Sequence, residues 1–555
     1  MKINPLFAID GYKTGHRQQY PVGTELVYGN FTPRTNKHFK SPFFSFRKGG
    51  SPLIWAGMQA FALQWLQETF NENFFSQPKD RMVNEFVAFM DSYIGKGAVP
   101  ADGVAALHDL GYLPIEIKAI PEGCYVDMKV PVFTIVNTQS EFFWLVNYLE
   151  TLLSAELWPV ATAATIAFNY RCIGEYWSVK TCDTADHLDW QFHDFSARGD
   201  MGMWANTLVG LGHLFSFTGT DSVLALRRLQ LQYEVDCLDG MSVNATEHSV
   251  MCMGEKVSEI ETFRRLITET YPEGIVSIVS DTWDYWKVVC EMLPQLKDTI
   301  TKRNGKVVIR PDSGDPVDII CGERFLDLDE LAHLGDALVY MRKAKADGLV
   351  CRYRNEYYRL VKDGFVAVPE HVIKGSIQMF WEIFGGTVNG KGFKVLHPSI
   401  GLIYGDSITM DRADEIFDRL AEKNFASSNV VLGIGSYTYQ YVTRDTFGFA
   451  MKATYGIVNG EPREIFKDPA TDDGTKKSLK GLMFHSLSDS GVWSVKDQAT
   501  PEEEQETQLT TIYKDGKILC FDTVSEIRNR IKYAVATFVK AKLSNDNKTK
   551  VKSNG

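Results

Sequence analysis

The sequence of 555 residues contains nine scattered cysteines and no CxxC pair. An odd number of cysteines at wide spacing argues against a disulfide framework and against a structural zinc site. The start of the chain, MKINPLFAIDGYKTGH, lacks the long apolar run of a secretory signal. No stretch approaches the ~18 uninterrupted apolar residues of a membrane helix. We therefore expect a protein of the reducing cytoplasm that has no membrane partner.

Positive charge is also scarce, because 59 lysines and arginines face 70 aspartates and glutamates, for a net charge of −11. Bulk binding of nucleic acid needs a basic face, so this balance argues against a nucleic-acid partner and requires any phosphate site to be a local cluster of cations. The hydrophobic share of 44% and the aromatic share of 12% are ordinary for globular proteins. At about 150 residues per domain the length allows three or four domains, or two if one is a large α/β barrel.

A repeated pattern runs through the middle of the chain. Short apolar runs are each followed by a polar or glycine-bearing turn and then by a helix-like segment, which predicts a parallel sheet covered by helices. Polar residues just past the strand ends are typical of the active face of a (β/α) barrel, although an open doubly wound sheet places its site there too. The number of units favours the barrel. The apolar runs are 188–192, 214–217, 275–279, 307–309, 402–404 and 430–432.

We predict an α/β fold with an irregular (β/α) barrel over residues 161–470 and an adjoining α+β domain over residues 1–160. Residues 471–540 are expected to pack back on the α+β region. The polar, lysine-rich tail at 541–555 is expected to be disordered.

An apparent insertion at 321–374 interrupts the barrel and is too long for an ordinary connection between a strand and a helix. Within it, two strand-like runs at 356–361 and 365–368 flank a glycine-bearing turn, which predicts a hairpin. The sequence gives no purpose for this insertion.

Two of the predicted strand ends carry groups that suit a ribose phosphate. The turn RPDSG at 310–314 offers Arg310 as a planar fork for a phosphate and Asp312 as an acceptor for vicinal hydroxyls. Gly405 and Asp406 repeat this arrangement at another strand end. A surface turn with a local salt bridge is the alternative for the first pair, and a helix N-cap is the alternative role for Asp406.

Further residues would complete such a site. The glycine turn GIGS at 433–436 presents backbone amides to a phosphate, although close packing explains most such turns. Phe195 and Arg198 share one turn and suit a flat ring joined to a phosphate-bearing sugar, unless they are a core phenylalanine and a surface arginine. His248 is a candidate catalyst, but a lone histidine is more often structural. Lysines that close over a polyphosphate, or only solvate a loop, are Lys452, Lys467, Lys476, Lys477 and Lys480.

Taken together, these segments resemble the nicotinamide phosphoribosyltransferase family, type II phosphoribosyltransferases that salvage nicotinamide for NAD. The resemblance extends from about Asn4 to Ile531, apart from the insertion. Where many relatives carry a glycine pair this chain has Gly435 and Ser436, and serine is small enough for a phosphate seat to survive. The motifs are AIDGYKTGHRQQYP (8–21), NFTPR (30–34), HDFSARG (193–199), GTDS (219–222), EHS (247–249), SDTWD (280–284), IRPDSGDP (309–316), YGD (404–406), TRD (443–445) and FKDP (466–469).

The resemblance implies a role for each matching residue. Phe195 would stack on the nicotinamide ring opposite Tyr12 of the partner subunit, and Asp221 would hold the carboxamide. His248 would be the histidine that ATP phosphorylates. Arg198, Arg310 and Arg444 would grip phosphates or orient the ring, and Asp312 and Asp406 would bind ribose hydroxyls beside Gly405. The diphosphate would meet Arg34, which would come from across a homodimer interface, and Lys452, Lys467 and Lys476.

The resemblance also implies that Mg²⁺ binds together with the diphosphate, that ATP is a coupled co-substrate, and that the protein is a homodimer with shared active sites. The reaction would join nicotinamide to phosphoribosyl pyrophosphate. Nicotinate phosphoribosyltransferase is the alternative enzyme, and a non-catalytic binding protein on the same scaffold is the alternative of another class.

Asp221 separates the two enzymes, because a carboxylate accepts a hydrogen bond from a carboxamide but repels the carboxylate of nicotinate. Two like charges ~4 Å apart repel by roughly 1 to 4 kcal/mol, depending on the effective dielectric. That is about five-fold to nearly a thousand-fold against nicotinate.

Overall fold

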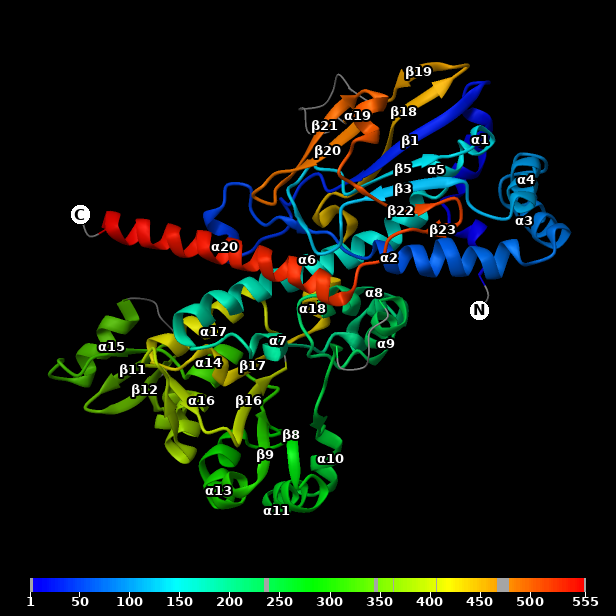
Figure 1. Cartoon of the computed structure of the whole chain (residues 1–555). Coiled ribbons are helices and arrows are strands. Elements are labelled where there is room, and N and C mark those ends of the chain that lie inside the picture. The colour runs from blue at the N-terminus through cyan, green and yellow to red at the C-terminus, as the bar shows by residue number, and fades with distance from the viewer. Residues whose placement is uncertain are drawn as a thin grey trace.

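Six parallel strands form the centre of the barrel region (Figure 1). The computed structural model describes residues 3–233, 239–343, 348–362, 364–405, 407–466 and 479–553. Nearly every residue of β16 and β17 is buried, as expected for parallel strands covered on both faces. In sheet order the strands are β6 (Phe192–Asp194), β17 (Val430–Ile434), β16 (Ile400–Tyr404), β9 (Asn304–Arg310), β8 (Glu273–Val279) and β7 (Asn244–Ala245).

The parallel sheet curls so far that one short segment joins its two edges. Asp194 at the end of β6 forms a parallel bridge with Thr220, and Gly219 forms another with Met241. The backbone N–H of Thr220 donates to the carbonyl oxygen of Met241 at 3.0 Å, and three residues later the chain enters β7 at the opposite edge. The predicted irregular (β/α) barrel is therefore confirmed, as a curled parallel half-barrel.

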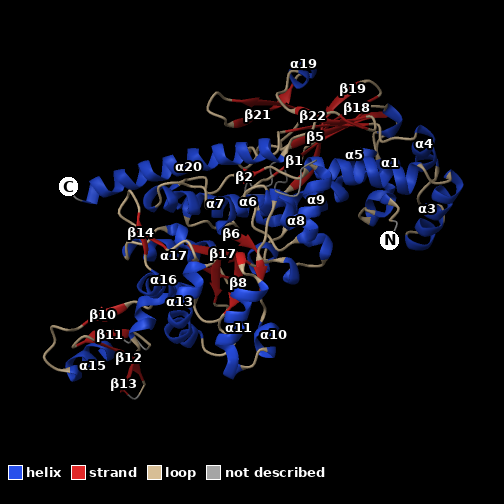
Figure 2. Ribbon diagram, turned by 60° about the horizontal axis from the view of Figure 1, so that its bottom comes forward, coloured by secondary structure: helices blue, strands red, loops and turns tan. Residues whose placement is uncertain are grey.

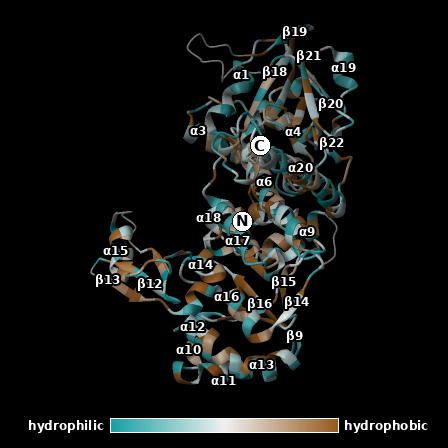
Figure 3. Ribbon diagram, turned by 90° about the vertical axis from the view of Figure 1, so that its left-hand side faces the viewer, coloured by the Kyte–Doolittle hydropathy of each residue, from teal (hydrophilic) through white to brown (hydrophobic). Residues whose placement is uncertain are grey.

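Helices cover the outside of this sheet (Figure 2). In Figure 3 the ribbons of β16 and α16 are largely brown, which marks the apolar interface between the strands and their helices. The covering helices include α8 (Met203–Leu214), α9 (Val223–Gln232), α10 (His248–Met253), α11 (Glu259–Arg265), α13 (Leu293–Lys302), α14 (Pro316–Cys321), α16 (Glu370–Phe384), α17 (Met410–Glu422) and α18 (Ser436–Gln440).

Two of the predicted strands are misplaced. The run at 188–192 is mostly α7 (Leu188–Gln191), and only its last residue begins β6. The run at 214–217 is the end of α8 and the turn after it. Both runs are buried in the main core, and an apolar run of this length does not distinguish a strand from a buried helix end.

The long helix α6 (Glu150–Thr181) lies between the barrel and the α+β region. It is the one helix of the described ranges that is long and apolar enough to cross a membrane, although 72% of its most apolar window is buried inside the protein. Polar residues such as Glu156 and Arg171 interrupt its apolar run, which is why no uninterrupted stretch is visible in the sequence. The core helix of a folded domain meets the same criterion.

A seven-stranded sheet forms the second region, and both ends of the chain contribute to it. Strand β18 pairs antiparallel with β1, and β22 pairs antiparallel with β3. The predicted barrel boundary at 470 is therefore too late, because β18 already belongs to this second sheet. In sheet order the strands are β19 (Glu461–Glu464), β18 (Ala450–Val458), β1 (Thr24–Thr32), β5 (Phe133–Asn137), β3 (Ile115–Ala119), β22 (Thr510–Lys514) and β23 (Lys517–Ile518).

Smaller elements surround this sheet. The hairpin of β20 (Leu482–Leu487) and β21 (Trp493–Ala499) leads into α19 (Pro501–Gln505). The N-terminal part adds η2 (Gly11–Gly15), α2 (Met58–Phe61), α3 (Lys79–Tyr93) and α4 (Asp102–Leu110).

The insertion forms a small module of its own at the side of the barrel (Figure 2). Its four strands are β10 (Phe325–Asp327), β11 (Val350–Tyr353), β12 (Glu356–Val361) and β13 (Gly364–Ala367), with α15 (Leu334–Lys343) beside them. Strands β12 and β13 pair antiparallel, so the predicted hairpin is present. A separate apolar cluster, including Leu328, Met341 and Cys351, lies inside this module.

The chain enters and leaves the insertion at one narrow neck. Gly322 and Gly375 both have positive φ values, of 84° and 75°. A Cβ atom on Gly375 would lie 2.2 Å from the backbone nitrogen of Gly322, so only glycine allows the two backbones to touch. The Lys423 ammonium donates to the carbonyl oxygens of Ile373 and Lys374 at 2.9 and 3.0 Å and closes the neck.

The C-terminal tail is helical rather than disordered, because α20 (Val524–Ser553) continues to the end of the described chain. It runs along α6 (Figure 1). The Lys542 ammonium lies over the rings of Phe43, Phe46 and Tyr176. The Tyr176 hydroxyl donates to the Asp546 carboxylate at 2.8 Å. These contacts explain why a polar segment remains ordered, and the sequence pattern alone does not reveal them.

Glu122 joins three parts of the fold and makes stability depend on pH. Its buried carboxylate accepts hydrogen bonds from the backbone N–H groups of Gly57 and Gln59 and from the Tyr233 hydroxyl. Burial raises the pKa of Glu122 to about 7, although the Gln59 and Gly57 donors oppose the rise. The folded state therefore holds a proton that the unfolded state releases near pH 4.5, and stability falls as pH rises from about 4.5 to about 7.

We expect Glu122→Gln to remove a fall of about 3 kcal/mol over that window. The measurement is the melting temperature at pH 5.5 and pH 8, which captures about 2 kcal/mol of that fall. The fall in melting temperature from pH 5.5 to pH 8 should be smaller in the variant than in the unchanged protein. Glu259, whose pKa burial also raises to about 7, keeps its share of the drop in both. Equal drops would contradict the assignment to Glu122.

Candidate active site

An aromatic ring and two strand-end glycines meet at the carboxyl edge of the parallel sheet. Phe195 directly follows β6, Gly433 lies in β17, and Gly405 follows β16. A Cβ atom on Gly433 would lie 2.5 Å from Cδ2 of Phe195. A Cβ atom on Gly405 would lie 3.6 Å from Cε2 of Phe195 and 3.3 Å from Oδ1 of Asp312. Three segments that are distant in sequence therefore converge beside one half-buried ring.

Asp221 is held beside this ring by two donors. The Nε2 atom of His193 and the Ser242 hydroxyl hydrogen-bond to Oδ1 of Asp221, at 2.9 and 2.5 Å. The His193 ring lies against Phe195, with 4.6 Å between ring centroids. Burial acts to raise the pKa of Asp221, but the hydrogen bonds from His193 and Ser242, with the nearby charge of Arg310, lower it overall. The carboxylate is therefore ionised at neutral pH, and no described residue donates to its Oδ2.

Asp194 organises the two loops that carry Phe195 and Asp221. Its carboxylate is fully buried and accepts from the Ser196 N–H at 2.9 Å and from the Ser222 hydroxyl at 2.7 Å. Its own carbonyl oxygen accepts from the N–H of Asp221 at 3.0 Å. Neither His193 nor Asp194 is among the site residues predicted from the sequence. One feature of the sequence points to them: both are polar and directly follow an apolar run. A polar group that is buried at such a position needs a hydrogen-bond partner.

A histidine between two carboxylates lies at the ends of the neighbouring strands. His248 begins α10 after β7, and its Nδ1 lies 3.1 Å from the Thr282 hydroxyl oxygen, in hydrogen-bond contact. Its Nε2 lies 4.0 Å from a carboxylate oxygen of both Asp281 and Asp312. Half of the His248 side chain is exposed, while Asp281 is 5% exposed. This face of the imidazole is thus open to a ligand.

Arg310 at the end of β9 is oriented toward the same place. Its Nη2 donates to the carbonyl oxygen of Thr246 at 2.6 Å. Its Nε is buried and has no hydrogen-bond partner in the described part of the chain, and the same holds for Oδ1 of Asp281. Unpaired buried polar atoms are costly, so a donor and an acceptor here await a ligand.

The glycine turn after β17 faces the loop that follows Phe195. Ser436 begins the short helix α18, and a Cβ atom on Gly199 would lie 1.9 Å from the Ser436 hydroxyl oxygen. A Cβ atom on Gly435 would meet nothing within 4 Å. Arg198 is exposed in the same loop. The turn and Arg198 therefore border one open edge.

Two of the predicted diphosphate cations, Arg34 and Lys452, gather with the predicted substrate-binding Arg444 in a separate cavity of about 280 Å³, on the side of the α+β region. Arg34, Arg444 and Lys452 line it together with two acidic residues, Asp10 and Glu150. The Nε of Arg34 donates to the carbonyl oxygen of Gly448 at 2.7 Å. Within one chain, the predicted site residues thus form two groups.

Tyr12 lies apart from the barrel edge in this chain. It lies in η2, its side chain is 66% exposed, and its ring contacts His16 and Lys13 of the same turn. Three further predicted residues, Asp406, Lys467 and Lys476, lie outside the described residues.

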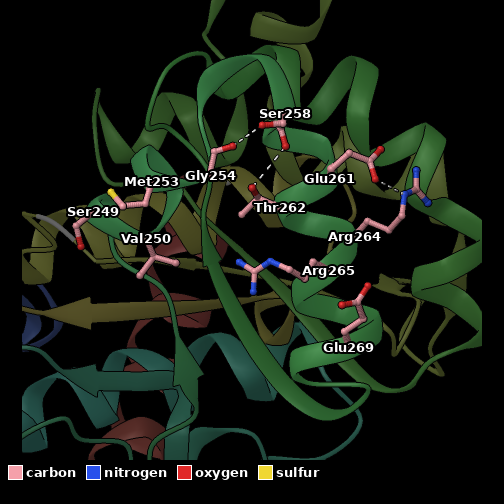
Figure 4. A pocket seen from close by; sticks show the side chains of 10 residues that line it. All are labelled: Ser249, Val250, Met253, Gly254, Ser258, Glu261, Thr262, Arg264, Arg265 and Glu269. Carbon is pink, nitrogen blue, oxygen red and sulfur yellow. Dashed lines mark hydrogen bonds and ion pairs between the residues drawn. The ribbon is translucent and has the colours of Figure 1, made fainter.

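A larger hollow of about 770 Å³ lies beyond α10 and does not contain the predicted site (Figure 4). Its lining comes from α10, α11 and the turns around them, and none of the predicted site residues belongs to it. Arg264 and Glu261 pair across part of its rim, as Figure 4 shows. The carboxyl edge of the sheet remains the candidate active site.

The curled parallel sheet, with glycines, carboxylates and an arginine at its carboxyl edge, is the architecture of a barrel-type enzyme with an attached α+β domain. The model of the Nicotinate phosphoribosyltransferase (NAPRTase) family matches residues 190–517. The chain belongs to this family, and it is an enzyme of the phosphoribosyltransferase class.

Relatives of known name are similar over almost the whole chain. The nicotinamide phosphoribosyltransferase of Acinetobacter baylyi is 47% identical over 543 residues, which cover 97% of this chain and 99% of that protein. The nicotinamide phosphoribosyltransferase of Mycoplasma pneumoniae is 30% identical over 497 residues, which cover 86% of this chain and 95% of that protein.

Among solved structures, human nicotinic acid phosphoribosyltransferase is similar with a TM-score of 0.51 and 14% identity, over 94% of this chain and 92% of that one. The nicotinate-nucleotide pyrophosphorylase of Pyrococcus furiosus has a TM-score of 0.50 and 14% identity, over 96% and 95%. At this level of identity the two structures support the fold alone.

Proposed function

We propose that this enzyme is a nicotinamide phosphoribosyltransferase, which joins nicotinamide and phosphoribosyl pyrophosphate to give nicotinamide mononucleotide and pyrophosphate in NAD salvage. The observation that carries the proposal is the ionised Asp221 beside the Phe195 ring. One oxygen of Asp221 is occupied by His193 and Ser242, which leaves the other for the N–H₂ of a carboxamide. The names of the two relatives agree with this substrate.

The reaction needs positioning and charge stabilisation more than acid–base chemistry. The pyridine nitrogen attacks the anomeric carbon of the ribose, and the bond from that carbon to the pyrophosphate oxygen breaks. No general base is required, because a neutral pyridine nitrogen carries no proton to lose. Phe195 holds the ring in line, Asp312 binds ribose hydroxyls, and Arg310 balances phosphate charge as the leaving group departs.

The donor set fits a magnesium ion that arrives with the diphosphate. Within the described ranges no group of three or more His, Cys, Asp or Glu side chains is arranged to hold a metal ion. Mg²⁺ usually keeps several waters and binds one or two carboxylates together with substrate phosphates. Asp312 and Asp281, whose Oδ1 accepts no hydrogen bond from a described residue, are suitable carboxylates. The ion supplies charge neutralisation for the departing pyrophosphate when it is bound.

We further propose that ATP transfers its γ-phosphoryl group to Nε2 of His248. If Nδ1 donates to the Thr282 hydroxyl, Nε2 keeps its lone pair for attack on phosphorus, and ADP leaves. The ring gains positive charge as the N–P bond forms. The carboxylates of Asp281 and Asp312, 4.0 Å from Nε2, favour that charge, although they repel the phosphoryl oxygens that Nε2 then carries.

The separation of the site residues into two groups supports a homodimer with shared active sites. Tyr12 is exposed and the cavity of Arg34 and Lys452 lies apart from Phe195, so a second copy has to supply them if all act on one substrate.

The eight described cysteines are all free, which supports a cytoplasmic location.

Nicotinate phosphoribosyltransferase is the second candidate, because the matching family carries that name. We expect Asp221→Asn to reduce the preference for nicotinamide over nicotinate by about tenfold, since it removes the charge that repels nicotinate. The measurement is kcat/KM for both substrates in the unchanged enzyme and in the variant. If the ratio of kcat/KM for nicotinamide to that for nicotinate is the same in the variant and in the unchanged enzyme, Asp221 does not have this role. If the unchanged enzyme makes no nicotinamide mononucleotide, the proposed function is refuted.

A further inference from the structure

The segment 34–50 forms a basic hollow, and Arg34 is its only residue with a role in the reaction described above. It contains five lysines and arginines and no aspartate or glutamate, in a chain whose net charge is −11. Residues of this segment, with Met128, line an open cavity of about 580 Å³. Four cationic side chains belong to the lining: Arg34, Lys40, Arg47 and Lys48.

The segment is held firmly, so these charges have a fixed arrangement. Phe43 and Phe44 are 1% and 2% exposed and insert into the main core. The side-chain amide of Asn36 donates to the carbonyl oxygens of Gly49 and Ser51, both at 2.7 Å, and ties the two ends of the segment together. A loop that only solvates the surface does not need such anchors.

The positive charge of the hollow is only partly neutralised. The Nη2 atom of Arg47 donates to both carboxylate oxygens of Asp127, at 2.6 and 2.9 Å. Lys40 and Lys48 are exposed and have no acidic partner in the described part of the chain. The Arg34 guanidinium uses its Nε for a backbone carbonyl, which leaves both terminal nitrogens for a ligand. The hollow therefore carries an excess of about three positive charges toward solvent.

Arg34 also lines the cavity that contains Arg444 and Lys452, so the hollow and the proposed diphosphate cations meet at one side chain. A row of cations that continues past a diphosphate site matches a longer chain of phosphates. We propose that the hollow of Arg34, Lys40 and Lys48 binds a polyphosphate: the triphosphate of a nucleoside triphosphate, or free pyrophosphate. The need for such a ligand rests on the proposed function, but its binding is measurable without turnover.

The test is calorimetric titration of the full-length protein with ATP and, separately, with pyrophosphate. We expect the double variant Lys40→Gln, Lys48→Gln to raise the Kd for at least one of them about tenfold, or about threefold per lysine, the scale of exposed charge pairs. The difference should disappear at 1 M salt, where the Debye length is about 3 Å. An effect on ATP alone assigns the hollow to the triphosphate, and an effect on pyrophosphate assigns it to the shorter anion as well.

The double variant Lys297→Gln, Lys302→Gln is the matched control, because both lysines are exposed on α13 and their replacement removes the same two charges at a distance from the hollow. It should leave both Kd values unchanged. Melting temperatures of the two variants check that the fold is intact. Kd values within twofold of the unchanged protein for both ligands in the double variant would overturn the inference. Absence of product from nicotinamide would instead refute the proposed function, so the two failures are distinguishable.

Discussion

A single methyl group at position 433 should lower kcat/KM for nicotinamide by at least about a hundredfold. In Gly433→Ala the new Cβ atom would lie 2.5 Å from Cδ2 of Phe195 and 2.8 Å from Cα of Gly405. The backbone of β16 and β17 is buried and cannot yield, so the Phe195 ring has to move. A shift of about 1 Å in a group that positions the substrate costs on the order of 10²-fold in rate.

The steric origin of this effect has a matched control. Gly335 in the insertion also has ordinary backbone angles, and a Cβ atom there would meet nothing within 4 Å. Gly335→Ala should therefore keep the kcat/KM of the unchanged enzyme. Steady-state kinetics with nicotinamide and phosphoribosyl pyrophosphate measure both variants. If Gly433→Ala retained full activity, the Phe195 slot would not be the nicotinamide site.

The central strands could be predicted from the sequence because the information is local. The runs at 275–279, 307–309, 402–404 and 430–432 all fall within observed strands. Each is a short apolar run that ends at a polar turn, as required for a strand covered on both faces. The run at 214–217 has the same pattern, but it is a buried helix end, and a short apolar run does not distinguish the two.

Long-range pairing could not be predicted in the same way. Strand β18 leaves the barrel to pair with β1, with Lys452 opposite Asn30, and nothing near Lys452 in the sequence indicates that partner. The end of α20 is ordered by the rings under Lys542, which come from distant segments. Both errors arose because the deciding contacts join parts of the chain that are far apart.

The residues of the candidate site also divide into those that local sequence predicts and those that depend on long-range contacts. Residues such as Asp312 and Gly405 were predicted because they follow apolar runs, and the structure brings both to Phe195. The roles of His193 and Asp194 depend on hydroxyl and amide donors from other loops, so they required coordinates. The resemblance implies that the partner subunit supplies Arg34, but that Lys452 and Arg444 line one cavity with Arg34 depends on the pairing of distant segments and was not predictable.

Replacement of His248 should abolish the stimulation of turnover by ATP. In His248→Ala the ratio of rates with and without ATP is expected to fall to one, because Nε2 is the phosphoryl acceptor. Measurable turnover without ATP should remain, since Phe195 and Asp312 still hold nicotinamide and ribose. Rates with and without ATP, and acid-labile incorporation of the γ-phosphoryl group into the protein, measure both parts of this prediction.

The label distinguishes a phosphorylated histidine from one that only binds ATP. If His248 only bound ATP, His248→Ala would still lower the stimulation, but the unchanged enzyme would carry no acid-labile phosphate. His333→Ala is the control, because His333 is exposed in the insertion and should alter neither the ratio nor the label. If His248→Ala kept its full ATP stimulation, the phosphohistidine would be excluded. The position of His248 between Asp281 and Asp312 would then require another explanation. The next role to test for this group is the binding of the Mg²⁺ ion that accompanies the diphosphate.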